Sequence, residues 1–278
     1  MQTVAVPREL KSVGVVGAGR MGTPIIGHLV RRKFATRAFD LNAARSDAVR
    51  ALGAKWTTNL EALAAECDAI LVCVGFDKEV RELLEASGPL RQARRGTVIA
   101  ILSTIHPKTV QALAQGAEGA GLHVVDSTVC RGGEAADSGT LLSFVGGDKE
   151  VVERLTPVLS AYSSDVVHTG GVGTAQVAKA VNNLILWACL VADHEGLALA
   201  RRYGADVEAL RRALLLSSCA NGPLEKWGMQ TMAWADDDMA IVAEMAADAG
   251  IALPQAEVNR EICRSLKPRR YKLDQYGR

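Results

Sequence analysis

The first 170 residues alternate short β-rich apolar runs with stretches whose apolar positions recur at helical spacing. Pro107 can open one of these helices, because proline is tolerated in a first turn. Strands separated by helices indicate βαβ units, so the pattern predicts an α/β fold with a doubly wound, mostly parallel sheet. The expected strands span residues 12–16, 36–40, 55–57, 69–74, 98–102, 124–126, 142–145 and 166–168, and the expected helices span 24–32, 44–52, 60–66 and 78–86, with another from 107.

The pattern changes after the glycine-rich segment 170–173. Residues 174–203 then run without proline and with a single glycine inside, which predicts one long helix. Helical patterning continues over residues 207–216, 239–249 and 255–266. We therefore expect an α/β domain over residues 1–170 and an all-α domain over residues 171–278, joined by the long interdomain helix.

Composition excludes several classes of partner. The chain is 49% hydrophobic and 23% charged with a net charge of +1, so no strong field favours nucleic acid or an anionic membrane. Its six cysteines are irregularly spaced without a CxxC pair, which argues against a disulfide framework, and we expect no metal site. The N-terminus lacks a signal-peptide core, and the most apolar run, 184–192, is short for a membrane span. A soluble, cytoplasmic protein is expected.

A glycine loop follows the first expected strand and precedes a helix, in the order Gly17-Ala18-Gly19-Arg20-Met21-Gly22. In such a loop, Gly17 permits the tight turn, Gly19 lets the backbone approach a pyrophosphate, and Gly22 lets helix and strand pack closely. The helix N-terminus offers unpaired N–H groups and a positive dipole end to the phosphates. The loop therefore predicts a dinucleotide site, and Arg20 either touches the pyrophosphate or lies in solvent.

An acidic residue, Asp40, ends the second expected strand. A carboxylate at this position can accept hydrogen bonds from the adenosine ribose hydroxyls and would repel a 2′-phosphate. The sequence therefore predicts NAD as cofactor, preferred over NADP.

Three segments together resemble the β-hydroxyacid dehydrogenase family, which includes 3-hydroxyisobutyrate dehydrogenase. They are the glycine loop extended to Pro24, the segment 126–132 leading into 138–141, and the Gly-x-x-Gly of 170–173 leading into 179–183. The resemblance covers roughly residues 12–255. It implies a Rossmann domain followed by an all-helical domain on one long helix, and it implies homodimers or homotetramers.

The resemblance also implies roles for residues of the long helix. The lysine at the position of Lys179 is the catalytic acid/base in that family, and Asn183 matches an asparagine that orients substrate and lysine. The chemistry agrees, because hydride transfer from an alcohol requires removal of the hydroxyl proton and a lysine can relay it. Asn182 and Asn183, three and four residues later, share the helix face of Lys179.

Further positions are expected to contact the ligands. Val74 and Gly75 end a strand and match backbone positions that line the cofactor, and Thr104 matches a position near the nicotinamide. Cys130, Arg131 and Gly132 match the substrate segment, but the family usually has serine and glycine where Cys130 and Arg131 stand. Sulfolactaldehyde reductases of the family also carry an arginine there, so Arg131 is expected either to bind an anionic substrate group or to form a salt bridge.

A second departure comes late in the chain. The family's usual Lys-Asp pair falls on Asp237 and Asp238, inside the acidic run Asp236–Asp238, so the usual cation over the substrate is missing. We interpret the run as an N-terminal cluster for the helix 239–249, where carboxylates suit the dipole.

Together these features predict an NAD-dependent oxidoreductase that interconverts a small hydroxy acid and its semialdehyde or keto form. Two alternatives remain. Imine reductases share this fold but usually replace the lysine with aspartate or tyrosine, so Lys179 argues against that activity. The altered Cys130, Arg131 and Asp237 also leave open a dinucleotide-binding regulator without turnover.

Overall fold

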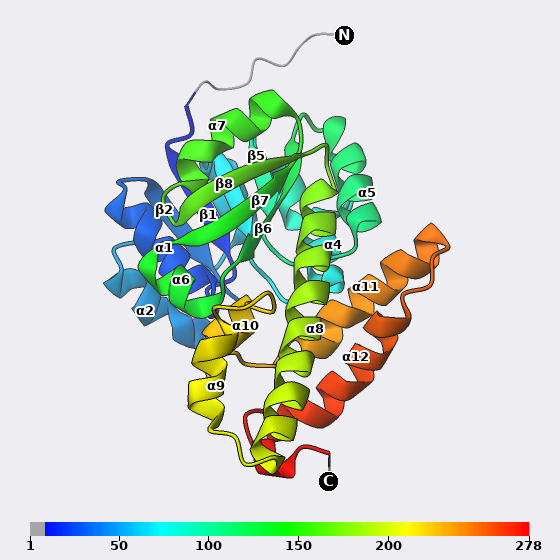
Figure 1. The fold of residues 1–278 in the computed structure, drawn as a ribbon. Helices are drawn as coiled ribbons and strands as arrows, with labels where there is room; N and C mark the ends of the chain where they lie inside the picture. The colour runs from blue at the N-terminus through cyan, green and yellow to red at the C-terminus, as the bar shows by residue number, and fades with distance from the viewer. Residues whose placement is uncertain (1–8, 278) are drawn as a thin grey trace. The chain divides into compact units, whose positions relative to one another are not determined.

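One eight-stranded sheet organises the first part of the chain (Figure 1). The computed structural model describes residues 9–277 and divides into two compact units, one ending at Lys179 and one beginning at Ala180. The strand order is β3-β2-β1-β4-β5-β6-β7-β8, and only β6 and β7 pair antiparallel. The strands are β1 (Ser12–Val16), β2 (Ala35–Phe39), β3 (Lys55–Trp56), β4 (Ala69–Val72), β5 (Val98–Ile101), β6 (His123–Cys130), β7 (Leu141–Gly146) and β8 (Ser163–Gly170).

Helices cover both faces of this sheet and enclose two separate apolar cores. Alternation along the strands divides the side chains, so that Val15 joins one core and its neighbour Val16 joins the other. On the first face lie α1 (Gly22–Arg31), α2 (Ser46–Ala51), α6 (Gly132–Ser138) and α7 (Lys149–Leu159). On the second face lie α3 (Leu60–Glu66), α4 (Asp77–Leu84) and α5 (Pro107–Glu118).

The predicted doubly wound α/β fold is confirmed, with local corrections that also include the unexpected helix α6 and a longer β8 in place of the strand 166–168. The expected strand 124–126 is the eight-residue β6, so most of the segment 126–132 is strand rather than loop. Helix α7 was missed, although its buried Val151, Leu155 and Val158 have helical spacing, because Pro157 lies inside it. The expected helix 44–52 begins as a 3-10 turn over Ala43–Arg45, before α2.

The second unit is entirely helical. Its apolar core joins α8 to α11 and α12 through side chains such as Trp187, Leu190 and Met239. A smaller cluster joins Leu197 of α8 to Leu224 and to the C-terminal segment at Leu273. The helices are α8 (Thr174–Arg202), α9 (Val207–Leu214), α10 (Gly222–Glu225), α11 (Ala235–Ala249) and α12 (Pro254–Leu266).

Helix α8 contributes residues to both units, so the division between the units falls inside this helix. Its first turns are tied to the sheet, because the buried Asp126 of β6 accepts hydrogen bonds from the backbone N–H groups of Gly173 and Gln176. Burial raises the pKa of this Asp126 carboxyl. The start of the long helix is therefore capped by the sheet itself.

Among the described helices, α8 is long and apolar enough, by length and composition alone, to cross a membrane. Its apolar stretch is thus longer than the run 184–192 noted in the sequence. Part of this apolar surface packs inside the protein, because Ala180, Trp187 and Leu190 are buried in the core of the helical unit.

The acidic run Asp236–Asp238 lies in the first turn of α11 rather than before it, since Trp234 occupies the N-cap position. Asp236 accepts hydrogen bonds from Arg260 and Arg264 of α12 at 2.8 and 2.9 Å, and these bonds lower the pKa of its carboxyl. Asp238 accepts a bond from the indole of Trp187 at 3.1 Å. Two carboxylates of the run therefore fasten α11 to its neighbours, which is a structural role.

A buried histidine anchors the C-terminal segment to α8. His194 is 1% exposed, and its Nδ1 lies 2.7 Å from the carbonyl oxygen of Leu190 while its Nε2 accepts a bond from the N–H of Tyr271 at 2.9 Å. The rings of Trp227, Tyr271 and Tyr276 surround it. Burial lowers the pKa of His194, and protonation would place a second proton against the Tyr271 N–H.

We expect stability to fall at acid pH through this group. Because the folded-state pKa of His194 is lowered, its contribution is fully present above the unfolded pKa of about 6.5 and is lost as the pH falls through the folded value. Urea unfolding at several pH values between about 5 and 8 should show a smaller pH slope for His194→Gln than for wild type. The matched control is His123→Gln in the first unit, because burial also lowers the pKa of His123. Equal slopes for wild type and His194→Gln would contradict the expectation.

Candidate active site

The glycine loop lies between β1 and α1, at the carboxyl end of the central parallel strands. Gly17 has a φ of +100°, a conformation that favours glycine, and a Cβ there would overlap the carbonyl oxygen of Cys73. A Cβ on Gly22 would overlap the carbonyl oxygen of Gly17. There is thus no room for a side chain at Gly17 or at Gly22, and the start of α1 stays open to a phosphate group.

Asp40 directly follows β2 and faces this loop. Its Oδ2 accepts bonds from the N–H of Ala18 at 2.7 Å and from Arg45 at 2.6 Å, and its Oδ1 accepts one from the N–H of Asn42. The carboxylate is largely buried, with 11% of the side chain exposed. Asp40 is therefore held against the glycine loop, and Arg45, which sequence reasoning missed, is the cation beside it.

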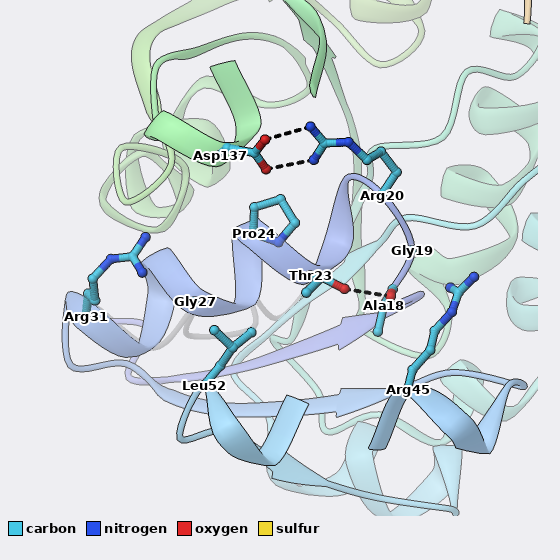
Figure 2. A pocket seen from close by; sticks show the side chains of 10 residues that line it. All are labelled: Ala18, Gly19, Arg20, Thr23, Pro24, Gly27, Arg31, Arg45, Leu52 and Asp137. Atoms are coloured by element: carbon cyan, nitrogen blue, oxygen red, sulfur yellow. Dashed lines mark hydrogen bonds and ion pairs between the residues drawn. The ribbon is translucent and has the colours of Figure 1, made fainter. Parts of the chain in front are cut away.

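A hollow of about 560 Å³ opens beside the loop and the outer side of α1 (Figure 2). Arg20 lies at its rim and binds Asp137 of α6 with two bonds of 2.7 and 2.6 Å, and the bonds lower the pKa of Asp137. Both side chains are more than half exposed. Arg20 therefore has a protein partner, which neither of the sequence-based alternatives included. The lining residues are Ala18, Gly19, Arg20, Thr23, Pro24, Gly27, Arg31, Arg45, Leu52 and Asp137.

The expected nicotinamide side of the site lies on the loops after β4 and β5. Val74 and Thr104 are half-buried and Gly75 is exposed. The two loops are linked, because the hydroxyl of Ser103 donates to the carbonyl of Val74 at 2.9 Å and accepts from its N–H at 3.1 Å. His106 caps α5 by accepting a bond from the N–H of Lys108. The structure therefore brings Val74 and Thr104 to neighbouring loops.

Lys179 reaches the end of β6 from the second turn of α8. Its Nζ donates a hydrogen bond to the carbonyl oxygen of Val129 at 2.8 Å and lies 3.9 Å from the thiol of Cys130. Lys179 is half-buried and Cys130 is buried. The ammonium is thus placed beside the predicted substrate segment, and a proton donor lies at the carboxyl edge of the sheet.

Arg131 and Gly132 follow β6 in left-handed conformations, with φ values of +83° and +78°. For a non-glycine residue such a conformation costs about 1–3 kcal/mol, which explains why glycine is usual at position 131 in the family. The Arg131 Nη1 compensates by bonding Asp165 at 2.6 Å, Ser164 at 2.8 Å and the carbonyl of Thr140 at 3.1 Å. Of the two roles considered for Arg131, the structure contains the salt bridge.

Helix α8 continues beyond Lys179 with Asn182 and Asn183. The Nδ2 of Asn182 donates to the Oδ1 of Asn183 at 3.0 Å, and Asn183 is 3% exposed. Asn183 lies one helical turn after Lys179, as the spacing requires. The hydrogen bond between Asn182 and Asn183 therefore joins two consecutive residues of α8.

Sequence reasoning also missed Gln176, a fully buried polar residue one turn before Lys179. A glutamine three residues before a candidate acid/base shares its helix face, which was the available signal.

The residues present fit a bound dinucleotide. The backbone cradle at Gly17 and Gly22 has no room for side chains, and Asp40 supplies an acceptor at the end of β2. No group of three or more His, Cys, Asp and Glu side chains within residues 9–277 is arranged to hold a metal ion. No disulfide joins any of the six cysteines, all of which lie within residues 9–277.

Comparison with known proteins supports the same assignment. The family model of the NAD-binding domain of 6-phosphogluconate dehydrogenase matches residues 12–171, which is more than half of the chain. The model for the NAD-binding region of NADP-dependent 3-hydroxyisobutyrate dehydrogenase matches residues 173–275.

Individual relatives cover nearly the whole chain. The 2-(hydroxymethyl)glutarate dehydrogenase of Eubacterium barkeri and the NAD-dependent L-serine dehydrogenase of Pseudomonas aeruginosa are each 29% identical, over 90% of this chain and 87% of theirs. Among solved structures, the 3-hydroxyisobutyrate dehydrogenase of Mycobacterium tuberculosis, studied with L-serine, superposes with a TM-score of 0.85. It is 23% identical, and the match covers 93% of this chain and 94% of that one, so it shows the shared fold.

Proposed function

Because the chain belongs to the β-hydroxyacid dehydrogenase family, whose members are NAD(P)-dependent dehydrogenases acting on hydroxyl groups, we propose that it interconverts a small hydroxy acid and its semialdehyde or keto form with NAD. The observation that carries the proposal is the position of Lys179, whose ammonium lies 2.8 Å from the carbonyl oxygen of Val129 at the end of β6. A binding protein without turnover would not need a proton-transfer group at that edge.

We assign the proton transfer to Lys179. The bound nicotinamide supplies the hydride acceptor or donor. In oxidation, the Lys179 amine removes the hydroxyl proton as the carbonyl forms, and in reduction its ammonium returns that proton to the carbonyl oxygen. The hydrogen bond to the carbonyl oxygen of Val129 restrains the Lys179 side chain and holds its ammonium beside the segment that carries Cys130.

The substrate is proposed to lie along Cys130, Arg131 and Gly132, beside Lys179. The small, buried Cys130 offers an apolar wall. The Arg131 guanidinium bonds Asp165 through Nη1, and we propose that its remaining nitrogens meet the acid group of the substrate. The salt bridge with Asp165 then fixes the orientation of the planar Arg131 guanidinium, which can bind a planar anion.

The function is tested by following absorbance at 340 nm with NAD and a panel of small alcohols. The panel contains 3-hydroxyisobutyrate, L-serine, 2-(hydroxymethyl)glutarate and 4-hydroxybutyrate, with neutral alcohols of the same length as controls. We expect turnover of at least one hydroxy acid and none of the neutral alcohols. Binding of NADH without turnover of any member would favour a regulatory role instead.

We propose NAD as the preferred cofactor on the basis of Asp40. Its carboxylate accepts three hydrogen bonds and keeps lone pairs for the ribose hydroxyls, whereas a 2′-phosphate would meet its negative charge. Arg45 reduces this repulsion because it is paired with the same oxygen. The discrimination therefore depends on the charge of Asp40 rather than on steric exclusion.

Asp40→Asn is expected to lower the ratio of kcat/KM for NAD to that for NADP by about tenfold or more, because a hydrogen bond to a charged group is worth about 1.5–3 kcal/mol. The substitution keeps the side-chain shape, removes the charge, and releases Arg45 toward a 2′-phosphate. Asp47→Asn on α2 is the matched control, since Asp47 is exposed and pairs only with Arg50 among the described ion pairs. A wild-type preference for NADP, or an unchanged ratio in Asp40→Asn, would refute the assignment.

Imine reduction is the less favoured activity, because Lys179 stands where imine reductases usually carry aspartate or tyrosine. We also propose a cytoplasmic homo-oligomer. The apolar side chains of Val181, Ile185 and Leu199 on α8 support the oligomer, since each is 48–59% exposed.

A further inference from the structure

A single buried amide joins α8 to the loop that carries Thr104. Gln176 is 1% exposed. Its Oε1 accepts a hydrogen bond from the N–H of Ile105 at 3.0 Å, and its Nε2 donates one to the carbonyl oxygen of Ser103 at 2.8 Å. These two backbone groups flank Thr104. Both polar ends of the glutamine side chain are therefore bonded to the peptide groups on either side of one residue.

The bridge continues in both directions. Ser103 is bonded through its hydroxyl to both backbone groups of Val74, on the loop after β4. The backbone N–H of Gln176 donates to the carboxylate of Asp126 in β6 at 2.9 Å. Gln176 thus connects the carboxyl ends of β4 and β5, and the middle of the neighbouring strand β6, to the first turns of α8.

The position of Gln176 along the helix gives the bridge a chemical consequence. Lys179 is three residues later and so lies on the same helix face. Helix α8 therefore holds both the loop at Thr104, through Gln176, and the ammonium of Lys179. A side chain that filled the same space without polar atoms would leave both backbone groups of the loop without these partners.

We propose that Gln176 is a positioning residue, which holds the Thr104 loop at a set place relative to Lys179 and so orients the nicotinamide ring for hydride transfer. The inference rests on the proposed function, because it takes the Thr104 loop as the nicotinamide side of the site. Gln176 itself does not transfer a proton. Its effect is geometric, and displacements near 1 Å in such sites can lower turnover by about a hundredfold.

The test compares Gln176→Ala with Thr128→Val. Thr128 is buried in β6 and its hydroxyl donates to the carbonyl of Ala175 at 3.0 Å, so Thr128→Val loses a buried bond to the same turn of α8 without touching the Thr104 loop. NADH is titrated into wild type and both variants, and affinity is read from quenching of tryptophan fluorescence. The emission of bound NADH reports the surroundings of the nicotinamide ring, and thermal unfolding reports stability.

We expect Gln176→Ala to bind NADH within about threefold of the wild-type Kd, since the glycine loop and Asp40 are unchanged. Its bound NADH should shift in emission toward that of free NADH, and kcat for the hydroxy acid identified by the panel should fall by about tenfold or more. Gln176→Glu keeps the acceptor for Ile105 and loses the donor to Ser103, so it should fall between wild type and Gln176→Ala. Thr128→Val should lose thermal stability and keep the wild-type emission.

Two results would overturn the inference: wild-type emission of NADH bound to Gln176→Ala, or the same emission shift in Thr128→Val. Failure of wild type to bind NADH would instead refute the proposed function itself, so the two failures are distinguishable.

Discussion

Lys179→Ala is expected to lower kcat by about two orders of magnitude or more, the usual contribution of a general acid/base. The substitution removes the Nζ that donates to Val129 and with it the proposed proton-transfer group at the edge of the sheet. NADH affinity should change little, because the glycine loop and Asp40 follow β1 and β2, whereas Lys179 contacts β6. Steady-state kinetics at saturating NAD, together with an NADH titration, measure both quantities.

Two further lysine variants sharpen this test. Lys179→Arg keeps the positive charge, but a guanidinium does not release its proton near neutral pH, so it should remain as defective as Lys179→Ala. Lys149→Ala is the control for loss of a lysine, because Lys149 is 78% exposed on α7. Turnover near the wild-type value in Lys179→Ala would reject the assignment of the acid/base.

Gly22→Ala is expected to weaken NADH binding by about tenfold or more, equivalent to about 1.4 kcal/mol. A Cβ at this position would overlap the carbonyl oxygen of Gly17, so the loop or the start of α1 must shift. A steric overlap of this kind costs about 1–3 kcal/mol. The thermal midpoint should fall as well, and isothermal titration with NADH gives the change in Kd.

Gly196→Ala provides the contrast. Gly196 lies inside α8, where an added Cβ would have no heavy atom within 4 Å. Alanine favours a helix interior over glycine by about 1 kcal/mol, so Gly196→Ala should raise stability and leave NADH affinity unchanged. Equal NADH affinity for Gly22→Ala and wild type would mean that the loop does not hold the pyrophosphate.

Under the proposed function, the departures at Cys130 and Arg131 concern the substrate rather than the cofactor. Arg131 adopts a left-handed conformation that glycine adopts without strain, so the arginine is retained at a conformational cost. Its side chain offsets that cost through Asp165, Ser164 and Thr140. At the acidic run, the residues on either side of Asp237 have structural roles, since Asp236 and Asp238 hold α11 to neighbouring side chains.

Periodicity alone determined much of the fold. Alternating strands and helices predicted the α/β sheet, because each strand and helix must bury its apolar face. The predicted end of the long helix from Thr174 lies within one residue of the observed end. The glycine spacing and Asp40 predicted the dinucleotide loop, since steric limits on backbone approach leave glycine as the residue for those positions. These features are local, so the sequence carries them.

Tertiary structure decided what depends on partners distant in the chain. The antiparallel pairing of β6 with β7, the ion pair of Arg131 with Asp165, and the fastening of Asp236 to α12 join segments whose proximity no local spacing reveals. Gln176 is the clearest case, because its two hydrogen bonds reach residues about seventy positions earlier. A buried amide is recognised as a bridge only when both of its partners are in place, and that requires the folded chain.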